Sequence, residues 1–186
     1  MPFIGNKPTA VPLSGNDIQD GTIGLADLSA TGTKDATTFL RGDNTFAVAG
    51  GGKILQVVTA TDSTERTTTS TSYVTASSTL SVDITPASTS NKIFLICNTP
   101  VKESLNGETF LGTIFRDSTD IGGNGLGLHY QENSSNIRFP MTMCVLDSPS
   151  SSSQITYTAR FKTTGGTATI NDGNRTGTLT AFEVSA

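Results

Sequence analysis

The side chains of this 186-residue sequence that could do acid–base or nucleophilic chemistry form no specific pattern. His129 is the single histidine, and it precedes Tyr130. A Ser–His–Asp site would need it as the general base, but Ser and Asp are too frequent here for any such match to be specific. We interpret His129 as a surface or interface residue. The alternative is that it lines a sugar groove with an aromatic edge.

The acidic residues give no clearer pattern. Glycoside cleavage needs two carboxyl groups facing each other across a cleft, and the nearest cluster is Glu103, Glu108, Asp117 and Asp120. Nothing in the sequence sets a distance between any two of them. Asp117 with Asp120, and Asp172 with Asn174, match only part of a calcium-loop pattern. We therefore predict no catalytic residue, no metal site and no cofactor.

The two cysteines lie inside apolar, strand-like runs. Cys97 follows Ile93–Ile96, and Cys144 lies between Met143 and Val145. A free, buried thiol is the usual outcome in such a run. A disulfide between the two is the alternative. A metal or nucleophile site is disfavoured because neither has a His or a second Cys at ligand spacing.

Two short motifs have stronger structural than functional readings. Arg41-Gly42-Asp43 spells an integrin-recognition tripeptide, but Gly-Asp-Asn also forms a turn between apolar anchors. Gly123-Asn124-Gly125-Leu126-Gly127 is glycine-rich, but a phosphate loop needs a helix after it. A strand-like stretch follows instead, so we predict a turn and a flexible loop.

The composition narrows the protein class. The net charge is −4, only 15% of residues are charged, and Thr and Ser make up 52 of the 186 residues. A simple nucleic-acid binder would carry a basic patch, and no apolar run approaches the ~20 residues of a membrane span. We therefore expect no nucleic-acid partner and no membrane insertion. Leu, Ile, Val and Phe are just frequent enough for a thin core.

From Lys53 onward, apolar and polar residues alternate with a period of two. Such alternation is typical of half-buried antiparallel strands, and Thr suits their exposed face. Clusters of Gly, Pro, Asn and Ser separate the runs. The predicted strands are 53–59, 71–76, 79–84, 92–98, 108–116, 126–131, 136–146, 154–163 and 178–184. Their number and spacing predict an all-β protein with an antiparallel β-sandwich, most simply a jelly roll.

Residues 1–52 have a different character. They contain isolated apolar residues without a lasting period, and they end in Gly50-Gly51-Gly52, a flexible joint. Such a segment has no core of its own, so we expect an extended, mostly irregular arm that docks on another protein. The apolar side chains available for docking are Phe3, Ile4, Ile23, Leu25, Leu28, Phe39, Leu40 and Phe46. The predicted domains are the arm, 1–52, and the sandwich, 53–186.

The last predicted strand carries apolar residues on both faces. Leu179 and Ala181 point to one side, and Phe182 and Val184 to the other. One reading is a central strand with loops over both faces. The other is a strand with one face in the sandwich and one against another subunit, in which case Phe182 and Val184 are interface residues.

Several stretches resemble virion proteins of bacteriophages. Thr37-Thr38-Phe39-Leu40-Arg41-Gly42-Asp43-Asn44-Thr45-Phe46-Ala47 is similar to a peptide that recurs in tail fibres and related appendages, "S-T-F-L-R-G-D-G-T-W". It departs from that peptide at Asn44 and Phe46, where Gly and Trp are usual.

Three further stretches extend the resemblance over both halves of the chain. Ser81–Leu95 resembles a strand–"I-T-P-S-S-T-S-S-K-I"–strand hairpin of small fibre and head-decoration domains. The ending Leu179–Val184 resembles their closing "L-T-A-x-E-V" strand, and Gly5–Ile23 resembles their leaders.

The resemblance implies a non-enzymatic homotrimer in the virion, assembled in the bacterial cytoplasm. Its N-terminal arm would bind the major capsid protein or another virion protein, and its β knob would project outward, with host surface glycans as a further partner. Because 186 residues leave no room for a long shaft, we favour a capsid decoration or head-fibre protein over a short tail-fibre adhesin. A carbohydrate-binding module is the alternative from another class, disfavoured by the absence of Trp and the presence of only three Tyr.

Overall fold

The structure, a computed structural model, describes residues 24, 29–36, 38–48, 53–105, 107–123, 125–132 and 136–186. Within these residues there is no helix long and apolar enough to cross a membrane. Contacts divide the chain into two units, Met1–Gly51 and Gly52–Ala186. We describe each unit by itself.

The described part of the first unit is a small hairpin. β1 (Thr38–Leu40) pairs antiparallel with β2 (Phe46–Val48). In the connection, the Asp43 carboxylate accepts hydrogen bonds from the N–H and the hydroxyl of Thr45, at 3.2 and 2.6 Å. Asn44 has a φ of 61°, a left-handed conformation that Asn tolerates in turns. The Arg-Gly-Asp tripeptide therefore belongs to a turn, as predicted.

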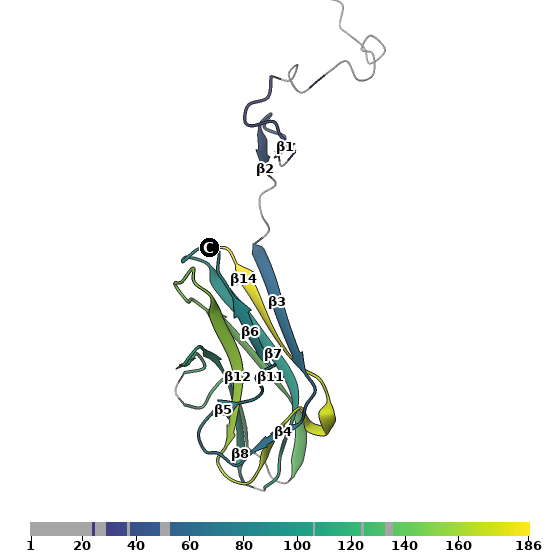
Figure 1. The fold of residues 1–186 in the computed structure, drawn as a ribbon, viewed down its shortest axis with the longest axis vertical. Helices are drawn as coiled ribbons and strands as arrows, with labels where there is room; N and C mark the ends of the chain where they lie inside the picture. The colour runs from purple at the N-terminus through teal and green to yellow at the C-terminus, as the bar shows by residue number, and fades with distance from the viewer. Residues whose placement is uncertain are drawn as a thin grey trace, which may run out of the picture. The chain divides into compact units, whose positions relative to one another are not determined.

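The second unit is built of antiparallel strands that the two-residue period largely predicts (Figure 1). Its described strands are β3 (Ile54–Asp62), β4 (Arg66–Thr68), β5 (Val74–Thr75), β6 (Ser81–Ile84), β7 (Lys92–Glu103), β8 (Thr109–Arg116), β9 (Thr119–Asp120), β10 (His129–Glu132), β11 (Ile137–Asp147), β12 (Ile155–Thr163), β13 (Ala168–Ile170) and β14 (Gly177–Val184). A short 3-10 turn, η3 (Asp172–Asn174), separates the last two.

Several of these strands are consecutive segments of longer, interrupted strands. The segments of one such strand pair with the same neighbouring strand, or with successive segments of it. In the first sheet, β3 and β4 pair with β14 and β13, and these two pair with successive parts of β7. β11 pairs with β7 along its whole length. In the second sheet, β6 and β5 pair with β12, β12 pairs with β8, and β8 pairs with β10 and β9. Each sheet is thus four strands wide.

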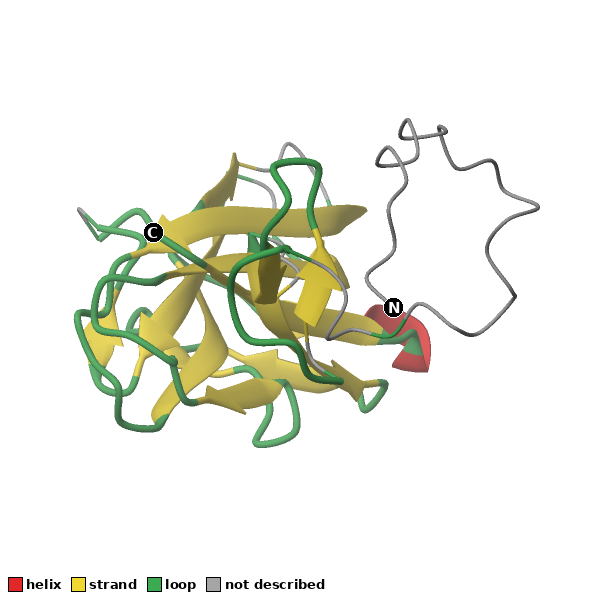
Figure 2. Cartoon of the chain, turned by 90° about the horizontal axis from the view of Figure 1, so that it is seen from above, coloured by secondary structure: helices red, strands yellow, loops and turns green. Residues whose placement is uncertain are grey.

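The pairing is nested along the chain. The first long strand pairs with the last, the second with the second to last, and so on to the adjacent pair β8 and β10. This order is that of a jelly roll, and Figure 2 shows the strands of the two sheets in separate layers. The predicted fold class is confirmed. The short strands β4, β9 and β13 were not predicted.

The core lies between the two sheets. Its largest fully buried side chains are Tyr157, Phe110, Phe161, Leu80, Ile84, Ile93, Leu95, Ile114, Met141, Met143, Ile170 and Leu179. Gly112 on β8 makes room for two of them, because a Cβ there would collide with the sulfur of Met141 and crowd that of Met143. The inward positions of β12 (Ile155, Tyr157, Ala159 and Phe161) are those that the alternation predicts.

The first sheet is interrupted beside Pro100 on β7. Pro100 lies opposite Pro140 of β11, and neither proline has the N–H that a hydrogen-bonded antiparallel pair exchanges. The backbone nitrogen and carbonyl of Pro100 therefore point away from β11, toward β13 and β14. Pro100 has no N–H to donate to these strands. There the chain leaves the sheet over residues 171–176. Asn171, with a φ of 56°, fastens this loop by accepting a 2.7 Å hydrogen bond from the Thr99 hydroxyl.

A buried carboxylate holds the opposite end of the first sheet. Glu183 of β14 is 1% exposed and occupies an inward position. It accepts hydrogen bonds from Asn91 Nδ2 at 2.6 Å, from the Ala87 N–H at 2.7 Å and from Gln56 Nε2 at 2.6 Å. Burial alone raises the pKa of Glu183, but these three hydrogen bonds outweigh it, so the pKa lies below its usual 4.5. Glu183 thereby ties the loop before β7 to β3 and β14.

We expect Glu183→Ala to lower the free energy of unfolding by about 3 kcal/mol, because it leaves buried donors without an acceptor. Since the folded-state pKa lies below the unfolded one, the contribution of Glu183 is present above pH 4.5 and is lost as the pH falls through the folded-state pKa. Urea denaturation at several pH values measures both effects. Glu183→Gln should show a weaker acid dependence than the natural chain, and Glu132→Ala, at an exposed position, should change little. An unchanged acid dependence in Glu183→Gln would contradict this account.

Candidate interaction surfaces

The two faces of β14 differ as the sequence predicts. Leu179 and Ala181 are fully buried between the sheets. Phe182 and Val184 lie on the outer face and are half-buried. The Phe182 ring contacts Phe94 of the neighbouring β7, with ring centroids 6.2 Å apart.

Phe182 is part of a continuous apolar surface on the outer face of the first sheet. The register places Val57, Phe182, Phe94 and Leu146 in one row across β3, β14, β7 and β11, and the next row continues with Ile96 and Cys144. We call this surface the apolar face: Ile54, Leu55, Val57, Phe94, Ile96, Cys144, Leu146, Phe182 and Val184. Val57 and Leu146 are 53% and 52% exposed.

The apolar face narrows along the strands before it ends, because Thr180 and Thr59 already lie in the row of Ile96 and Cys144. One row beyond Ile96 and Cys144, all four strands carry short polar side chains: Thr61, Thr178, Asn98 and Thr142. Elsewhere the outward positions of β12 are Thr and basic residues, as in an ordinary solvated sheet. Clustered apolar residues on one exposed face are typical of a contact surface rather than of a random distribution.

The structure describes three of the predicted docking residues. Phe39 and Leu40 are 62% and 49% exposed, and Phe46 is half-buried within the hairpin. Thr31 joins the hairpin through a hydrogen bond from the Phe46 N–H to its carbonyl at 2.7 Å. The other five, Phe3, Ile4, Ile23, Leu25 and Leu28, lie outside the described residues. Among the described residues, the hairpin therefore leaves large parts of Phe39 and Leu40 exposed.

His129 lies in an aromatic cluster. Its ring stacks on Phe139, with centroids 5.6 Å apart, and meets the edge of Phe110 at 6.3 Å. Burial lowers the pKa of His129, which favours the neutral imidazole. Nε2 is buried, and no hydrogen-bond partner for it is found among the described residues.

The four candidate carboxylates do not form a site. Glu103 is buried and accepts a 2.8 Å hydrogen bond from the Thr163 hydroxyl, while Glu108 accepts one from Thr164. Asp117 accepts one from the Thr156 N–H, and Asp120 accepts those of Thr113 and Gly122. Glu103, Glu108 and Asp117 thus each fasten a neighbouring strand or loop, and Asp120 fastens its own hairpin. The described residues contain no group of three or more His, Cys, Asp or Glu that could hold a metal ion.

The two thiols lie on opposite faces of neighbouring strands. Cys97 pairs with Met143 and points inward, whereas Cys144 pairs with Ile96 and is exposed. Such side chains cannot be bridged, because their Cβ atoms point apart. The expectation of two buried thiols is wrong for Cys144, since the alternation of β11 assigns the inward positions to Met141 and Met143.

No protein-family model and no curated protein matches the sequence. Among solved structures, the chain is similar to a chain of the Gx strain of infectious bursal disease virus, with 15% sequence identity and a TM-score of 0.40. It is also similar to a chain of the T13 particle of that virus (15% identity, TM-score 0.43) and to one of its VP2 subviral particle (16% identity, TM-score 0.41). These alignments cover 78%, 87% and 87% of this chain but 40%, 41% and 43% of the others, so the chain spans about two fifths of their length. Similarity this low carries no functional information.

We expect Cys97 to resist alkylation at pH 8 in the folded protein. Burial, with a smaller contribution from the nearby Cys144, raises the pKa of Cys97 to about 12, so little reactive thiolate forms. Peptide mapping after treatment with iodoacetamide should find Cys97 modified only in denaturant. A disulfide between Cys97 and Cys144 in the non-reduced map would contradict the strand register.

Proposed function

We propose that the chain is a non-enzymatic structural protein of a bacteriophage virion, a homotrimer that decorates the capsid. In this proposal copies of the sandwich associate through the apolar face. The first unit docks on the major capsid protein or another virion protein, and the sandwich projects outward. The single observation that carries the proposal is the apolar face, on a molecule whose surface is otherwise rich in Thr and Ser.

The energetics favour a second copy of the same chain as the occupant of this face. Covering a half-exposed aliphatic or aromatic side chain contributes roughly 1 kcal/mol, and the face presents nine apolar side chains on three adjacent strands and the edge strand β3. That sum is on the scale of the cost of association. The row of Phe182 and the row of Ile96 contain no charged side chain, and Lys92 lies opposite Val184 at the margin, so copies of this acidic protein can approach there without placing carboxylates opposite each other.

Three copies, rather than two, follow from the resemblance of the Thr37–Ala47 and Leu179–Val184 stretches to trimeric virion proteins. The exposed Phe39 and Leu40 of the hairpin support docking, because these two apolar side chains are 62% and 49% exposed in the described part of the chain. A short tail-fibre adhesin would have the same two surfaces, and only the location on the particle separates the two functions.

Phe182→Asp should convert the trimer into a monomer, because it places a charge in the middle of the apolar face. Light scattering on the full chain measures this as a fall from three times the 19.3-kDa chain mass to that mass. Thr178→Asp is the matched control, since Thr178 lies on the same strand and face but in the polar row, and it should remain trimeric. Cys144 should be alkylated faster in Phe182→Asp than in Thr178→Asp. A natural chain that is monomeric at all concentrations would overturn the assembly.

The double variant Phe39→Ser, Leu40→Ser should lose binding to particles while remaining trimeric. Removing two exposed apolar anchors is expected to reduce the affinity by roughly tenfold or more. The measurement is co-sedimentation of the added protein with particles stripped of it, with Arg41→Gln at the tip of the same turn as control. Equal binding of the natural chain and the double variant would exclude docking through the hairpin.

Particles without this protein separate the two virion locations. A decoration protein predicts capsids that break at lower temperature while adsorption to host cells is kept. Unchanged capsid stability with lost adsorption would assign the chain to the tail as an adhesin.

A further inference from the structure

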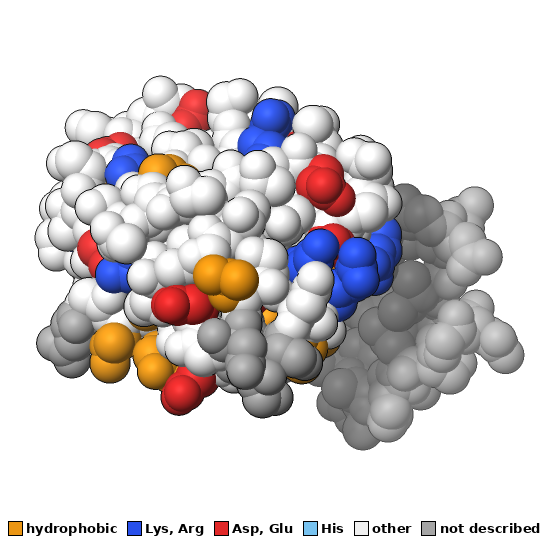
Figure 3. Space-filling view, turned by 90° about the horizontal axis from the view of Figure 1, so that it is seen from below, with side chains coloured by type: hydrophobic (Ala, Val, Ile, Leu, Met, Phe, Trp, Pro, Cys, Tyr) orange, Lys and Arg blue, Asp and Glu red, His pale blue; other side chains and the backbone are white. Residues whose placement is uncertain are grey.

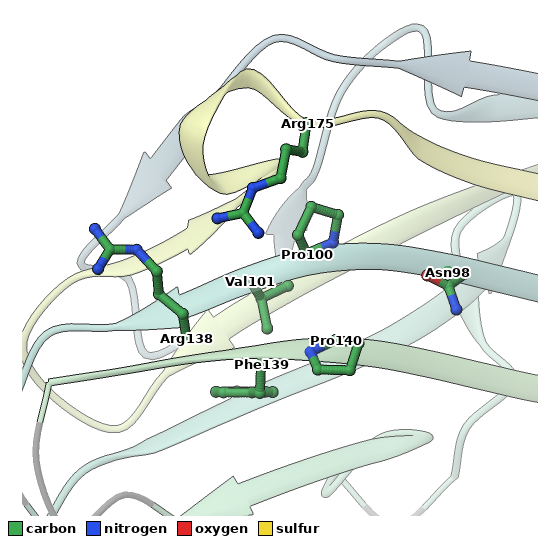
Figure 4. A pocket seen from close by; sticks show the side chains of 7 residues that line it. All are labelled: Asn98, Pro100, Val101, Arg138, Phe139, Pro140 and Arg175. Atoms are coloured by element: carbon green, nitrogen blue, oxygen red, sulfur yellow. The ribbon is translucent and has the colours of Figure 1, made fainter.

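A pocket of about 240 Å³ lies in the first sheet at the end away from the apolar face. It is lined by Asn98, Pro100, Val101, Arg138, Phe139, Pro140 and Arg175, which come from β7, β11 and the loop before β14 (Figure 4). In the view of the sandwich from below, Lys and Arg side chains gather on one side (Figure 3). We call the pocket lined by these seven residues the arginine pocket.

The interruption of the sheet creates the arginine pocket. Because the chain leaves the sheet beside Pro100, the space next to β7 is open there instead of being filled by a strand. The loop that leaves the sheet brings Arg175 to this space, and β11 contributes Arg138 (Figure 4). Pro100 and Pro140 lie opposite each other below them.

One buried carboxylate orients both arginines. Asp172 Oδ2 accepts hydrogen bonds from Arg138 Nε at 2.8 Å and from Arg175 Nη2 at 3.0 Å, and the side chain of Asp172 is 6% exposed. Arg175 Nε also donates to the Asp172 carbonyl at 3.0 Å. Two flexible side chains are thus held in one geometry before any ligand arrives, which reduces the entropy lost on binding.

The two guanidinium groups keep unused donors and an excess of positive charge. Each has five N–H donors, and in the described part of the chain Arg138 uses only Nε. Lys102 lies opposite Arg138 on β7 and adds a third positive charge. On the other side Glu65 accepts a 2.7 Å hydrogen bond from the Gly173 N–H. Three cations against Asp172 and Glu65 leave the site positive in a protein whose net charge is −4.

We propose that the arginine pocket binds the carboxylate of an acidic sugar, a uronic acid unit of an anionic polysaccharide. An arginine fork matches a carboxylate with two parallel hydrogen bonds. The prolines and Phe139 supply apolar contacts for the C–H groups of a sugar ring. The volume lies below the ~300–1,000 Å³ of pockets for drug-sized ligands, which suits a single ring.

Asn98 distinguishes an acidic sugar from simpler anions. Its Nδ2 donates to Thr142 Oγ1 at 3.0 Å, which leaves Oδ1 as an acceptor on the pocket lining. A simple carboxylate such as acetate has no donor for this oxygen, whereas a uronic acid carries several hydroxyl groups beside its carboxylate. The nearest lining residue, Asn98, lies two rows of side chains from the Phe182 row and outside the apolar face, so the proposal does not depend on the subunit assembly.

Titration of the full chain with D-galacturonate and D-glucuronate tests the proposal. The arginine Nε–H signals in nitrogen-correlated NMR spectra should shift in a saturable way, with a dissociation constant on the order of millimolar for so small a ligand. Glucose, which lacks the carboxylate, and acetate, which lacks the hydroxyls, should each bind roughly tenfold more weakly or worse. Absence of any saturable shift with both uronates would overturn the proposal.

Variants separate a built sugar site from general attraction of anions. Arg138→Gln and Arg175→Gln should each weaken uronate binding by roughly tenfold, while Arg138→Lys, which keeps the charge but not the fork, should restore little of it. Arg41→Gln, in the first unit, should bind like the natural chain. Thermal melting controls for folding.

Equal binding of inorganic phosphate would replace the sugar with a general anion. Tighter binding of a tri-aspartate peptide would replace it with a protein partner. Loss of uronate binding with an intact trimer would leave the virion proposal untouched.

Discussion

The division of the first sheet depends on the missing N–H of Pro100. A regular strand beside β7 would need that donor, and without it the chain leaves the sheet and returns only at Gly177. On one side of this break the sheet is regular, and its outward positions carry Phe94, Phe182 and the rest of the apolar face. On the other side the loop brings Arg175 to the surface, where the buried Asp172 accepts its hydrogen bond. One backbone constraint thus places two chemically different surfaces on the same side of one layer.

The sandwich is built with little charge and many hydroxyl groups. Threonine suits this composition because its β-branched side chain fits a pleated surface and its hydroxyl bonds to neighbours across strands, as between Thr59 and Thr180 at 3.1 Å. Several inward polar groups are matched to partners. Asp147, for example, accepts the two Arg116 hydrogen bonds at 2.8 and 2.9 Å and the Tyr157 hydroxyl at 2.6 Å. Buried polar groups of this kind specify one arrangement of strands, because displacing them leaves donors unpaired.

Alternation of residue types was enough to predict the fold class, the long strands and the outward direction of Phe182 and Val184, since these depend on local period alone. It did not predict β4 and β13, because three-residue segments contain too few positions to show a period. Cys144 was misplaced because its apolar neighbours Met143 and Val145 suggested burial for the whole run. The arginine pocket was missed for another reason. Arg138 is far in the sequence from Asp172 and Arg175, which belong to one loop. Only the register of β11 on β7 brings Arg138 to this loop. The alternation of the last strand places Glu183 on the same face as Leu179 and Ala181, but a carboxylate is rarely buried, so its inward position was not predicted.

Pro140 has a second consequence on the far side of β11. Its backbone nitrogen points away from β7, toward an edge of the sheet where the described residues place no further strand. A free edge with a full set of N–H groups invites another chain to add a strand, and so to polymerise. A proline in the middle of the edge removes the donor that such an addition would need. At this position of the edge, the proline ring therefore weakens the addition of a strand from another copy.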